Sequence, residues 1–517
     1  MYTQHLLGRL APPSVSRRVS WPILLLAVAV MATAPAPSRA GAQDAGFADS
    51  ADAGVHRPAV DALAGWGYFE GTECDTGRFC PEDPIDRWVM AVWLVRALGY
   101  TPRDTGESRF DDVSADEWWS PYAERIARQE ITSGCEEAPL RYCPDRPVTR
   151  GMMATFLVRA LRIEEAPPAG FVDTAGDTHE AAIDALAAAG ITSACKTEPL
   201  SYCPSKPVTR GQMATFLHRA IRTSDRAILA VLYHTTDGPN WTSNKNWLTP
   251  GPLEGWGGVT TDDDDRVTHL VLEANGLAGP IPPLLAYLSQ LESLKLPKNS
   301  LTGPIPPRLN SLRQLKVLDL SDNLLDGPIP SGLTELTLLE YLALGGNKLS
   351  GAIPSGFGNL ADLELLSLRD NRLTGAIPAE VGTLTSLTWM SLARNGLDGP
   401  IPPELGNLAN LRALILSYNR LSGSIPPELG RLSDLVNLYL DNNHLTGEIP
   451  DQLGNLTLLT LLDVANNWLE GRIPASLGDL PDLNYVRFHG GNRFVGCVPA
   501  GLMDTSHDFS LMELPFC

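Results

Sequence analysis

Eight cysteines carry the plainest chemistry in this chain, and they lie in four close pairs. Such pairs either form disulfides or supply thiolates to a metal ion. A zinc site needs four ligands together, whereas the first three pairs recur in separate stretches without a His at a fixed position. An even number of cysteines in an exported chain therefore predicts disulfides and no metal site. The predicted bridges are Cys74–Cys80, Cys135–Cys143, Cys195–Cys203 and Cys497–Cys517.

Three arginines form a second candidate site, because each follows a residue suited to cap the start of a helix. They are Arg87, Arg150 and Arg210, after Asp86, Thr149 and Thr209. A cation opposes the helix macrodipole at this end, so the choice is locally unfavourable. An anion would be held by the free backbone N–H groups and the guanidinium together. The alternative is an ion pair between each arginine and a carboxylate of a neighbouring repeat.

No residue pattern in the sequence matches an enzyme active site. His179-Glu180 lacks a second His at metalloprotease spacing. We find neither a Gly-x-Ser-x-Gly elbow nor a phosphate-binding glycine loop, and nothing places two acids in one cleft. We therefore expect a non-enzymatic protein with no cofactor.

Length and charge narrow the class of protein further. At 517 residues the chain exceeds one ordinary core, so at least two domains are expected. The formal net charge of −20 argues against nucleic acid as a partner, because that binding needs clustered Lys and Arg. Apolar residues make up 44% of the chain, which is typical of globular proteins.

Residues 1–42 are predicted to be a signal peptide. Basic residues precede an apolar run over residues 21–34, which is too short to span a membrane comfortably. Ala40-Gly41-Ala42 then offers a small-residue cleavage site. An uncleaved anchor helix is the alternative. Residues 43–57 are rich in Ala, Asp and Gly and are predicted to form a flexible spacer.

Residues 58–222 contain three copies of a repeat of about sixty residues. Cys135 and Cys143 recur 60 residues later, and so does Thr149-Arg150-Gly151. Near the end of each copy, apolar residues at i, i+3, i+4 and i+7 predict an amphipathic helix with a core-facing stripe. Each copy is predicted to be helix, bridged loop, helix. The predicted boundaries are about 58–105, 106–166 and 167–222.

These motifs resemble S-layer homology (SLH) repeats. Phe110-Asp111-Asp112, a helix, a turn, Pro147-Val148-Thr149-Arg150 and a second helix follow that family's order. The family commonly uses three repeats as one pseudo-threefold unit and holds exported bacterial proteins non-covalently to cell-wall polysaccharide. The resemblance implies polymer contacts by Arg150 and Arg210, and by Arg87 in the most diverged copy. The family's Ala-Glu after this arginine is Gly-Met or Gly-Gln here.

Ten asparagines recur through the second half, the first nine spaced by 24 residues and the last by 25. Leu-x-Leu precedes each one in most copies, and Gly follows four positions later. A fixed period of this length predicts a solenoid in which Leu-x-Leu strands stack into a parallel sheet. The asparagine amides would satisfy buried backbone groups of their own and the adjacent coil. They are Asn275, Asn299, Asn323, Asn347, Asn371, Asn395, Asn419, Asn443, Asn467 and Asn492.

The pattern Leu-x-x-Leu-x-Leu-x-x-Asn-x-Leu-x-Gly-x-Ile-Pro closely resembles plant-type leucine-rich repeats (LRR). The resemblance implies a solenoid over 269–496, an N-terminal cap over 223–268 that contains three Trp residues, and a disulfide-closed C-terminal cap over 497–517. The expected fold class is therefore multidomain. An α-helical SLH pseudo-trimer precedes an α/β leucine-rich repeat solenoid with a parallel β-sheet.

Residues that point outward from the predicted strands are the candidate ligand contacts. Tyr, Trp and Arg are the usual anchors of protein interfaces. Against this, exposed strand positions favour aromatic residues on propensity alone. The acidic run Asp262–Asp265 could hold calcium, but a solvated turn is expected. The predicted ligand-binding stripe on the inner curve consists of Tyr341, Arg369, Trp389, Arg394, Tyr418 and Tyr439.

The expected function is that of a secreted, wall-attached recognition protein. The first module would anchor the chain to cell-wall polysaccharide, and the solenoid would bind a protein or glycan. No nucleic acid partner and no membrane span after signal removal are expected. The alternatives are a structural envelope protein, in which the solenoid only spaces or packs, and a released effector that acts on a host.

Overall fold

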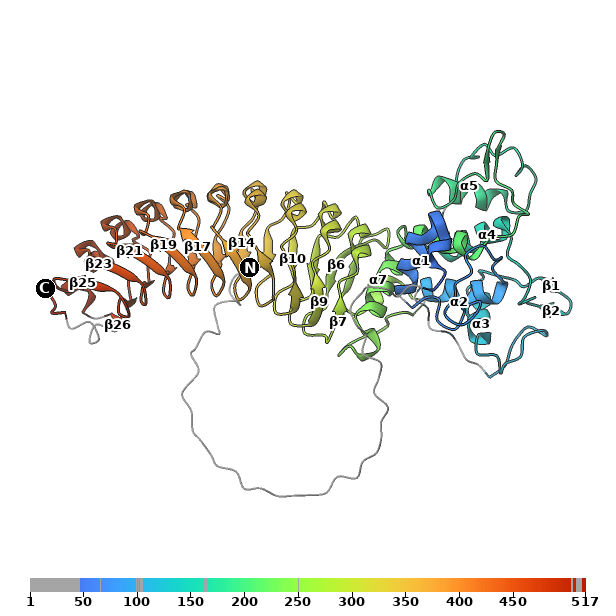
Figure 1. Ribbon diagram of the computed structural model, residues 1–517, viewed down its shortest axis with the longest axis horizontal. Coiled ribbons are helices and arrows are strands. Elements are labelled where there is room, and N and C mark those ends of the chain that lie inside the picture. Colours follow the sequence, from blue (N-terminus) through green and yellow to red (C-terminus); the bar gives the residue numbers. More distant parts are fainter. Residues whose placement is uncertain are drawn as a thin grey trace, which may run out of the picture. The chain divides into compact units, whose positions relative to one another are not determined.

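The computed structural model describes residues 47–517, except 66, 99, 101, 103–105, 162, 164, 250, 504 and 508–513. The predicted signal peptide, 1–42, and the start of the predicted spacer, 43–46, lie outside the described residues. None of the helices in the described ranges has the length and apolar character needed to cross a bilayer. Helices with short hairpins come first along the chain, and the coils of a solenoid follow them (Figure 1).

Each copy of the sixty-residue repeat folds as a helix, a loop and a second helix. The apolar stripe of the second helix is buried, with Met153, Phe156 and Leu157 at most 5% exposed. In the third copy, Thr209 and Gln212 form a capping box that fixes the start of the second helix. The helices are α1 (Arg57–Gly65), α2 (Arg87–Ala97), α3 (Ser120–Arg128), α4 (Arg150–Leu161), α5 (Glu180–Ala188) and α6 (Arg210–Ile221). The loops of the later copies carry antiparallel hairpins, β1 (Glu136–Glu137) with β2 (Leu140–Arg141) and β3 (Lys196–Thr197) with β4 (Leu200–Ser201).

The three copies close into a ring. Helix α2 packs on α3, α4 packs on α5, and α6 packs back on α1. Three backbone hydrogen bonds repeat this cyclic order just before the second helices. The N–H of Ile85 donates to Val208, that of Val148 to Ile85 and that of Val208 to Val148, each at 2.9 Å. Each copy therefore contacts the other two, and the three form one cooperative unit.

The prediction of a flexible spacer over residues 43–57 is wrong from Phe47 onward, because these residues are fixed by contacts with the first copy. Asp49 is only 5% exposed, and its carboxylate accepts two backbone N–H groups of the first bridged loop at 2.8 and 2.7 Å. Asp112 and Asp173 bind the loops of the second and third copies in the same way. Phe47-Ala48-Asp49 is thus the first occurrence of the Phe-x-Asp motif. It leads into a short 3-10 helix, η1 (Ser50–His56), so the first copy begins before its predicted boundary.

The four predicted disulfides are confirmed. Three of them close the loops between the helices of the three copies, and the fourth closes the C-terminal cap. Each loop is held twice, because the Asp carboxylate of the Phe-x-Asp motif also accepts the backbone N–H of the loop's second Cys. Covalent and polar contacts therefore fix the same turn.

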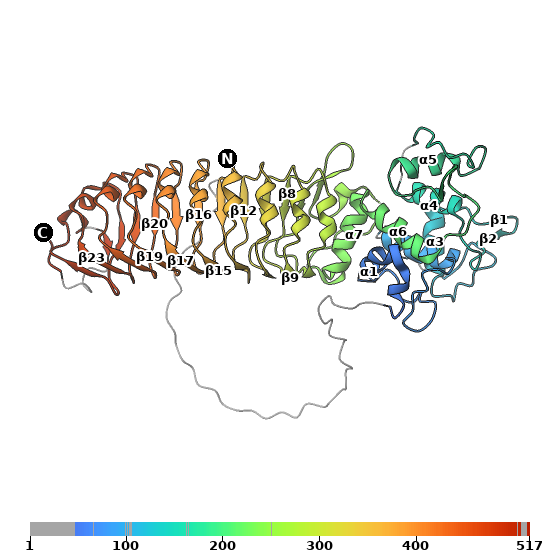
Figure 2. The same cartoon turned by 45° about the horizontal axis from the view of Figure 1, so that its top comes forward.

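The predicted parallel sheet is also confirmed, and its strands follow one another in chain order along the solenoid (Figure 2). One strand per coil is in register with the next, so that Tyr341 lies opposite Leu365 and Leu365 opposite Trp389. Among the described strands of this sheet, the first pair, β5 with β6, is antiparallel and the others are parallel. The strands are β5 (Val259–Thr261), β6 (Val267–Val271), β8 (Ser293–Lys295), β10 (Val317–Asp319), β12 (Tyr341–Ala343), β14 (Leu365–Ser367), β16 (Trp389–Ser391), β18 (Ala413–Ile415), β20 (Asn437–Tyr439), β22 (Leu461–Asp463), β24 (Tyr485–Arg487) and β26 (Ser506–His507).

A second set of short parallel strands follows the ladder asparagines, and 3-10 turns complete the coils. In chain order these strands are β7 (Ala278–Pro280), β9 (Ser300–Pro304), β11 (Leu324–Asp326), β13 (Ser350–Gly351), β15 (Arg372–Gly375), β17 (Gly396–Pro400), β19 (Arg420–Gly423), β21 (His444–Gly447), β23 (Trp468–Arg472) and β25 (Arg493–Val495). The turns are η4 (Pro283–Tyr287), η5 (Pro307–Ser311), η6 (Ser331–Glu335), η7 (Ser355–Asn359), η8 (Ala379–Thr383), η9 (Pro403–Asn407), η10 (Pro427–Arg431), η11 (Asp451–Asn455) and η12 (Ala475–Asp479).

The ten asparagines of the repeat, hereafter the ladder asparagines, bind the backbone of adjacent coils as predicted. The Nδ2 group of Asn371 donates to the carbonyl groups of Leu344 and Leu368 at 3.0 and 3.1 Å. Its Oδ1 atom accepts the N–H of Leu349 at 2.9 Å. The leucines that surround the ladder are fully buried. One side chain per coil therefore satisfies backbone groups that the apolar core would otherwise leave unpaired.

Both ends of the solenoid are capped. At the first coil, α7 (Asp225–Thr235) begins after Ser224, whose hydroxyl accepts the N–H of Ala227. Two short 3-10 helices follow, η2 (Gly238–Asn240) and η3 (Leu253–Gly255). The three predicted Trp residues, Trp241, Trp247 and Trp256, are buried and in contact, with ring centres 4.7 and 5.0 Å apart. At the other end, η13 (Ala500–Leu502) and the fourth disulfide cover the last coil.

Candidate functional site

The solvent-facing side of the twelve-stranded sheet, here called the sheet face, carries the candidate ligand contacts. In each coil up to that of Asn467 it consists of the residues six, four, two and one positions before the ladder asparagine, and in the last coil Tyr485 and Arg487 take the first two of these places by register. Apolar residues at the intervening positions, mostly Leu, point into the core and are buried. The scaffold therefore leaves these four positions free to vary, and they determine what the sheet face can bind.

The six predicted ligand contacts do not form one stripe. Tyr341 and Trp389 share the row six positions before the ladder, two strands apart, with Leu365 in register between them. Tyr439 lies in the row four positions before it, further along the sheet. Position within the coil, rather than residue type, decides where each side chain lies. The structure therefore divides the predicted stripe into separate groups.

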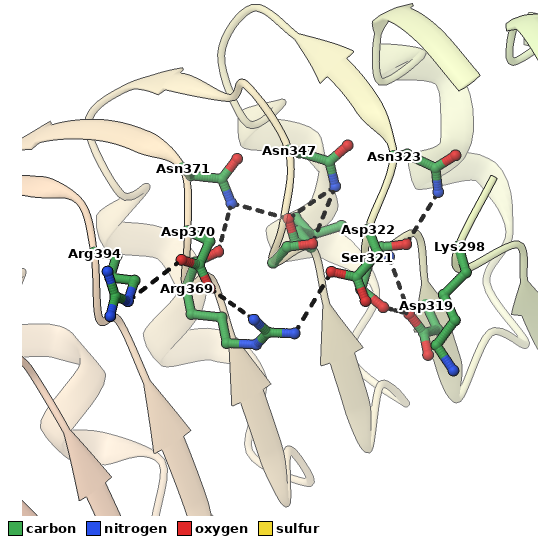
Figure 3. Close-up of polar contacts among 12 residues, drawn as sticks. Lys298, Asp319, Ser321, Asp322, Asn323, Asn347, Arg369, Asp370, Asn371 and Arg394 are labelled. Carbon is green, nitrogen blue, oxygen red and sulfur yellow. Dashed lines mark hydrogen bonds and ion pairs between the residues drawn. The ribbon is translucent and has the colours of Figure 1, made fainter. Parts of the chain in front are cut away.

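Arg369 and Arg394 belong to a chain of charges at the edge of the sheet face (Figure 3). The Arg369 guanidinium lies 2.6 Å from a carboxylate oxygen of Asp370 and 3.5 Å from one of Asp322 on another coil. Arg394 reaches the same Asp370 at 3.7 Å. Ion pairs as exposed as these contribute about 1 kcal/mol or less each. The acids were not predicted as part of the site, and they hold Arg369 in place.

Arg394 also stacks on Tyr418 of the next coil. Its guanidinium carbon lies 4.2 Å from the centre of the tyrosine ring. The Arg394 side chain is 58% exposed and Tyr418 is 46% exposed. The structure thus joins two of the predicted residues into one exposed cation–π pair.

Tyr341, on β12, is half-buried. Burial, reinforced by the nearby charge of Asp319, raises the pKa of the Tyr341 hydroxyl to about 12. The phenol is therefore neutral at physiological pH and can donate a hydrogen bond to a ligand.

A second polar group lies toward the C-terminal end of the sheet face, and the sequence prediction included only its tyrosine. Tyr439, Asp463 and Arg487 occupy the same position on three neighbouring strands. Asp463 is 3% exposed and pairs with Arg487 at 3.1 Å. Burial and the adjacent carboxylate of Asp441 raise the pKa of Asp463 to about 6, although Arg487 opposes this shift. The equal spacing of the three residues was the available signal, whereas the burial of Asp463 depends on its neighbours.

The three arginines of the helical module lie inside it. Arg87, Arg150 and Arg210 are 1%, 6% and 5% exposed. The Nε–H of each donates to a carbonyl group of the next copy around the ring, at 2.7, 2.8 and 2.6 Å. Burial lowers the pKa of Arg210 to about 10, although nearby acids oppose the shift.

These contacts argue against the predicted polymer contacts by Arg87, Arg150 and Arg210, because a buried guanidinium with engaged donors is not offered to a polymer in solvent. The alternative of ion pairs with carboxylates also needs correction, since the acceptors are backbone carbonyl groups and, for Arg87, additionally the hydroxyl group of Thr132. Each guanidinium additionally lies over an aromatic ring, within 4.5 to 5.1 Å of its centre. The arginines are structural ties between copies.

Three groups of one Asp and two Cys resemble metal sites only by proximity. They are Asp49 with Cys74 and Cys80, Asp112 with Cys135 and Cys143, and Asp173 with Cys195 and Cys203. All six cysteines are in disulfides, so they have no thiolate to offer. The acidic run considered for calcium is a turn between β5 and β6, in which Asp262 accepts the backbone N–H groups of Asp264 and Arg266.

Comparison with known protein families gives a match to the coils. The leucine-rich repeat region family matches residues 290–445, and the Leucine Rich Repeat family matches residues 458–480. The solenoid is a leucine-rich repeat domain. No curated protein matches the chain.

Several solved structures resemble this leucine-rich repeat domain. The Arabidopsis receptor kinase HAESA, in complex with the peptide hormone IDA and the co-receptor SERK1, is 36% identical over 56% of this chain and 48% of its own, with a TM-score of 0.50. The ectodomain of the Arabidopsis receptor kinase GASSHO1/SCHENGEN3, in complex with CASPARIAN STRIP INTEGRITY FACTOR 2, is 40% identical over 50% of this chain and 32% of its own, with a TM-score of 0.48. A plant ice-binding protein is 28% identical over 57% of this chain and 97% of its own, with a TM-score of 0.48. The chain thus spans less than half the length of the HAESA and GASSHO1/SCHENGEN3 structures.

Proposed function

We propose that this protein is a non-enzymatic, exported bacterial recognition protein. Its leucine-rich repeat domain binds a peptide or protein partner through the sheet face, and its helical module anchors it to cell-wall polysaccharide. The anchoring half extends the resemblance of the three repeats to the SLH family. The binding half rests on the chemistry of the sheet face.

One observation carries the binding half. The repeat fixes the core positions of every coil, yet the free positions of the sheet face hold exposed Arg394 and Tyr418 together with half-buried Tyr341 and Trp389. Such residues bury large areas at little entropic cost and recur as interface hot spots. The solved structure of HAESA contains a bound peptide hormone. The similarity to it favours a peptide or protein partner over a glycan.

Selection of peptides from a random library on the full exported chain tests this proposal. We expect enriched peptides to bind the wild-type chain, and Trp389→Ala to weaken that binding at least tenfold. Trp468→Ala is the matched control, because Trp468 is 59% exposed but lies on β23, outside the sheet face. Equal loss in both variants, or loss only with Trp468→Ala, would contradict binding through the sheet face.

Three features of the helical module support anchoring. Its three copies share the Phe-x-Asp motif, they close head to tail, and their three disulfides suit an extracytoplasmic compartment. Co-sedimentation of the full exported chain with purified cell-wall sacculi tests the anchor. We expect the chain to bind intact sacculi. This binding should be lost when every wall polysaccharide except peptidoglycan has been removed. Absence of binding to intact sacculi would favour a released effector.

A structural envelope protein is the other candidate. It would use the sheet face for self-association, so the full chain would form concentration-dependent assemblies that Trp389→Ala dissolves. A monomer at all concentrations in analytical ultracentrifugation would exclude it.

A further inference from the structure

The residue directly before each ladder asparagine has an unusual backbone. All ten of these positions have positive φ, from 49° to 75°. This left-handed conformation suits Gly, Asn and Asp and disfavours larger side chains. Six of the ten positions follow that rule, with Asp322, Gly346, Asp370, Asn442, Asn466 and Gly491.

Arg394 and Tyr418 break the rule on two consecutive coils. Their φ values are 55° and 56°, and both carry large side chains that the conformation disfavours. Packing does not account for the choice, because both side chains project into solvent. Asn at the same position of the following coils shows that the scaffold itself does not need a large residue.

Lys298 also lies directly before a ladder asparagine and also has a large side chain, but the fold itself uses that side chain. Its ammonium lies 2.6 Å from the carboxylate of Glu273 on the preceding coil, so its charge is used within the fold. Arg394 differs, because Asp370 is 3.7 Å away and is already bound by Arg369 at 2.6 Å. The Arg394 guanidinium thus keeps most of its donors for another acceptor.

We propose that Arg394 and Tyr418 form a clamp for a carboxylate of the bound partner, an inference that rests on the proposed function. The tyrosine ring holds the guanidinium plane at 4.2 Å by cation–π stacking, which orients its N–H groups for two parallel bonds to one carboxylate. The Tyr418 hydroxyl is a further donor. The carboxylate comes either from an Asp or Glu side chain or from the carboxyl terminus of the partner.

Peptide selection with chemically matched variants tests the clamp. Random decapeptides displayed with a free carboxyl terminus would be selected on the full exported chain. Each enriched peptide would then be synthesised in three forms: as selected, with Gln and Asn in place of Glu and Asp, and with an amidated terminus. Fluorescence anisotropy would measure the affinity of each form for wild type, Arg394→Gln and Arg420→Gln. Arg420 is the control, because it is exposed but begins β19 outside the sheet face.

We expect one carboxylate to matter in the wild-type complex. Its removal should weaken binding at least tenfold, and Arg394→Gln should weaken binding equally, with no further loss when both changes are combined. If the form with Gln and Asn loses affinity, the carboxylate belongs to a side chain. If the amidated form loses affinity, it belongs to the carboxyl terminus. Arg420→Gln should bind all forms as the wild type does.

Peptides that bind wild type and Arg394→Gln equally, or whose carboxylates contribute independently of Arg394, would overturn the clamp. If Trp389→Ala still abolished their binding, the proposed function would stand without it. Failure to enrich any peptide would contradict both.

A stability measurement separates a functional from a structural role. Arg394→Asn replaces a disfavoured residue by one that tolerates the left-handed backbone, so the unfolding temperature should rise slightly while carboxylate binding is lost. A fall in the unfolding temperature would mean that Arg394 serves the fold, and would overturn the proposal.

Discussion

Replacement of Arg150 by Met should destabilise the helical module, because this arginine ties the second copy of the repeat to the third. Its Nε–H donates to the carbonyl group of Tyr202 at 2.8 Å, and its Nη2 group to that of Ser193 at 2.7 Å. The guanidinium carbon lies 4.5 Å from the centre of the Tyr202 ring. Methionine has similar length and can restore part of the apolar contact, but neither hydrogen bond.

The expected loss follows from those two acceptors. Each buried carbonyl group left without a donor costs about 1–3 kcal/mol, so the free energy of unfolding should fall by about 3 kcal/mol after repacking. A change of 1 kcal/mol moves the unfolding temperature of a domain of about 150–250 residues by about 2–4 °C. The unfolding temperature of the helical module should therefore fall by about 6–12 °C.

Differential scanning calorimetry of the full exported chain measures this shift. Arg146→Met is the matched control, because Arg146 is exposed and lies in the loop just before α4, and it should change the unfolding temperature little. Arg150→Lys should lie between the two, since an ammonium keeps the charge but not the fork of donors. Binding to sacculi that is lost without a change in the unfolding temperature would refute this reasoning and restore a polymer contact for Arg150.

Three further predictions concern the solenoid. Asn371→Leu should lower the free energy of unfolding by about 2–4 kcal/mol, and hydrogen exchange at the Leu349 amide should become faster because that N–H loses its acceptor. Unchanged exchange at Leu349 would contradict the role of the ladder asparagines. Asp463 has a folded pKa of about 6, above the unfolded value of about 3.9, so the folded state binds more protons and stability should fall by about 2 kcal/mol as pH rises from about 4 to about 6. Asp463→Asn should remove that slope in denaturant titrations at several pH values, and a slope that persists would assign it to another group. Gly406→Ala should destabilise the fold by about 1–3 kcal/mol, because the added carbon would collide with the backbone of Glu428 on the next coil. Gly251→Ala is the control and should leave stability unchanged, because its added carbon meets only a side-chain oxygen at 3.9 Å.

Spacing along the chain determined which features the sequence could predict. The ladder asparagines, the strands and the bridged loops all depend on contacts between residues at a fixed repeat distance, so a single periodic pattern located them. The sequence also placed the cap Trp residues and the four disulfides, because their partners are close in the chain.

Features that depend on distant partners could not be predicted in this way. Arg210 donates to Phe79, which is 131 residues away, so its burial follows only from closure of the ring. Asp49 lies in a segment whose composition is that of a linker, and only its contact with the first loop shows its role. On the sheet face, candidate residues could be chosen by residue type, but their grouping required the register of the strands.

If the sheet face binds the partner, peptide binding must shield its side chains from solvent. Hydroxyl-radical footprinting of the chain without residues 1–42, with and without a peptide enriched by selection, measures this shielding. Trp389 and Tyr418 should be protected, while Trp468 on the second set of strands should react equally in both samples. Protection of Trp468 with unchanged reactivity at Trp389 and Tyr418 would show that the partner binds outside the sheet face.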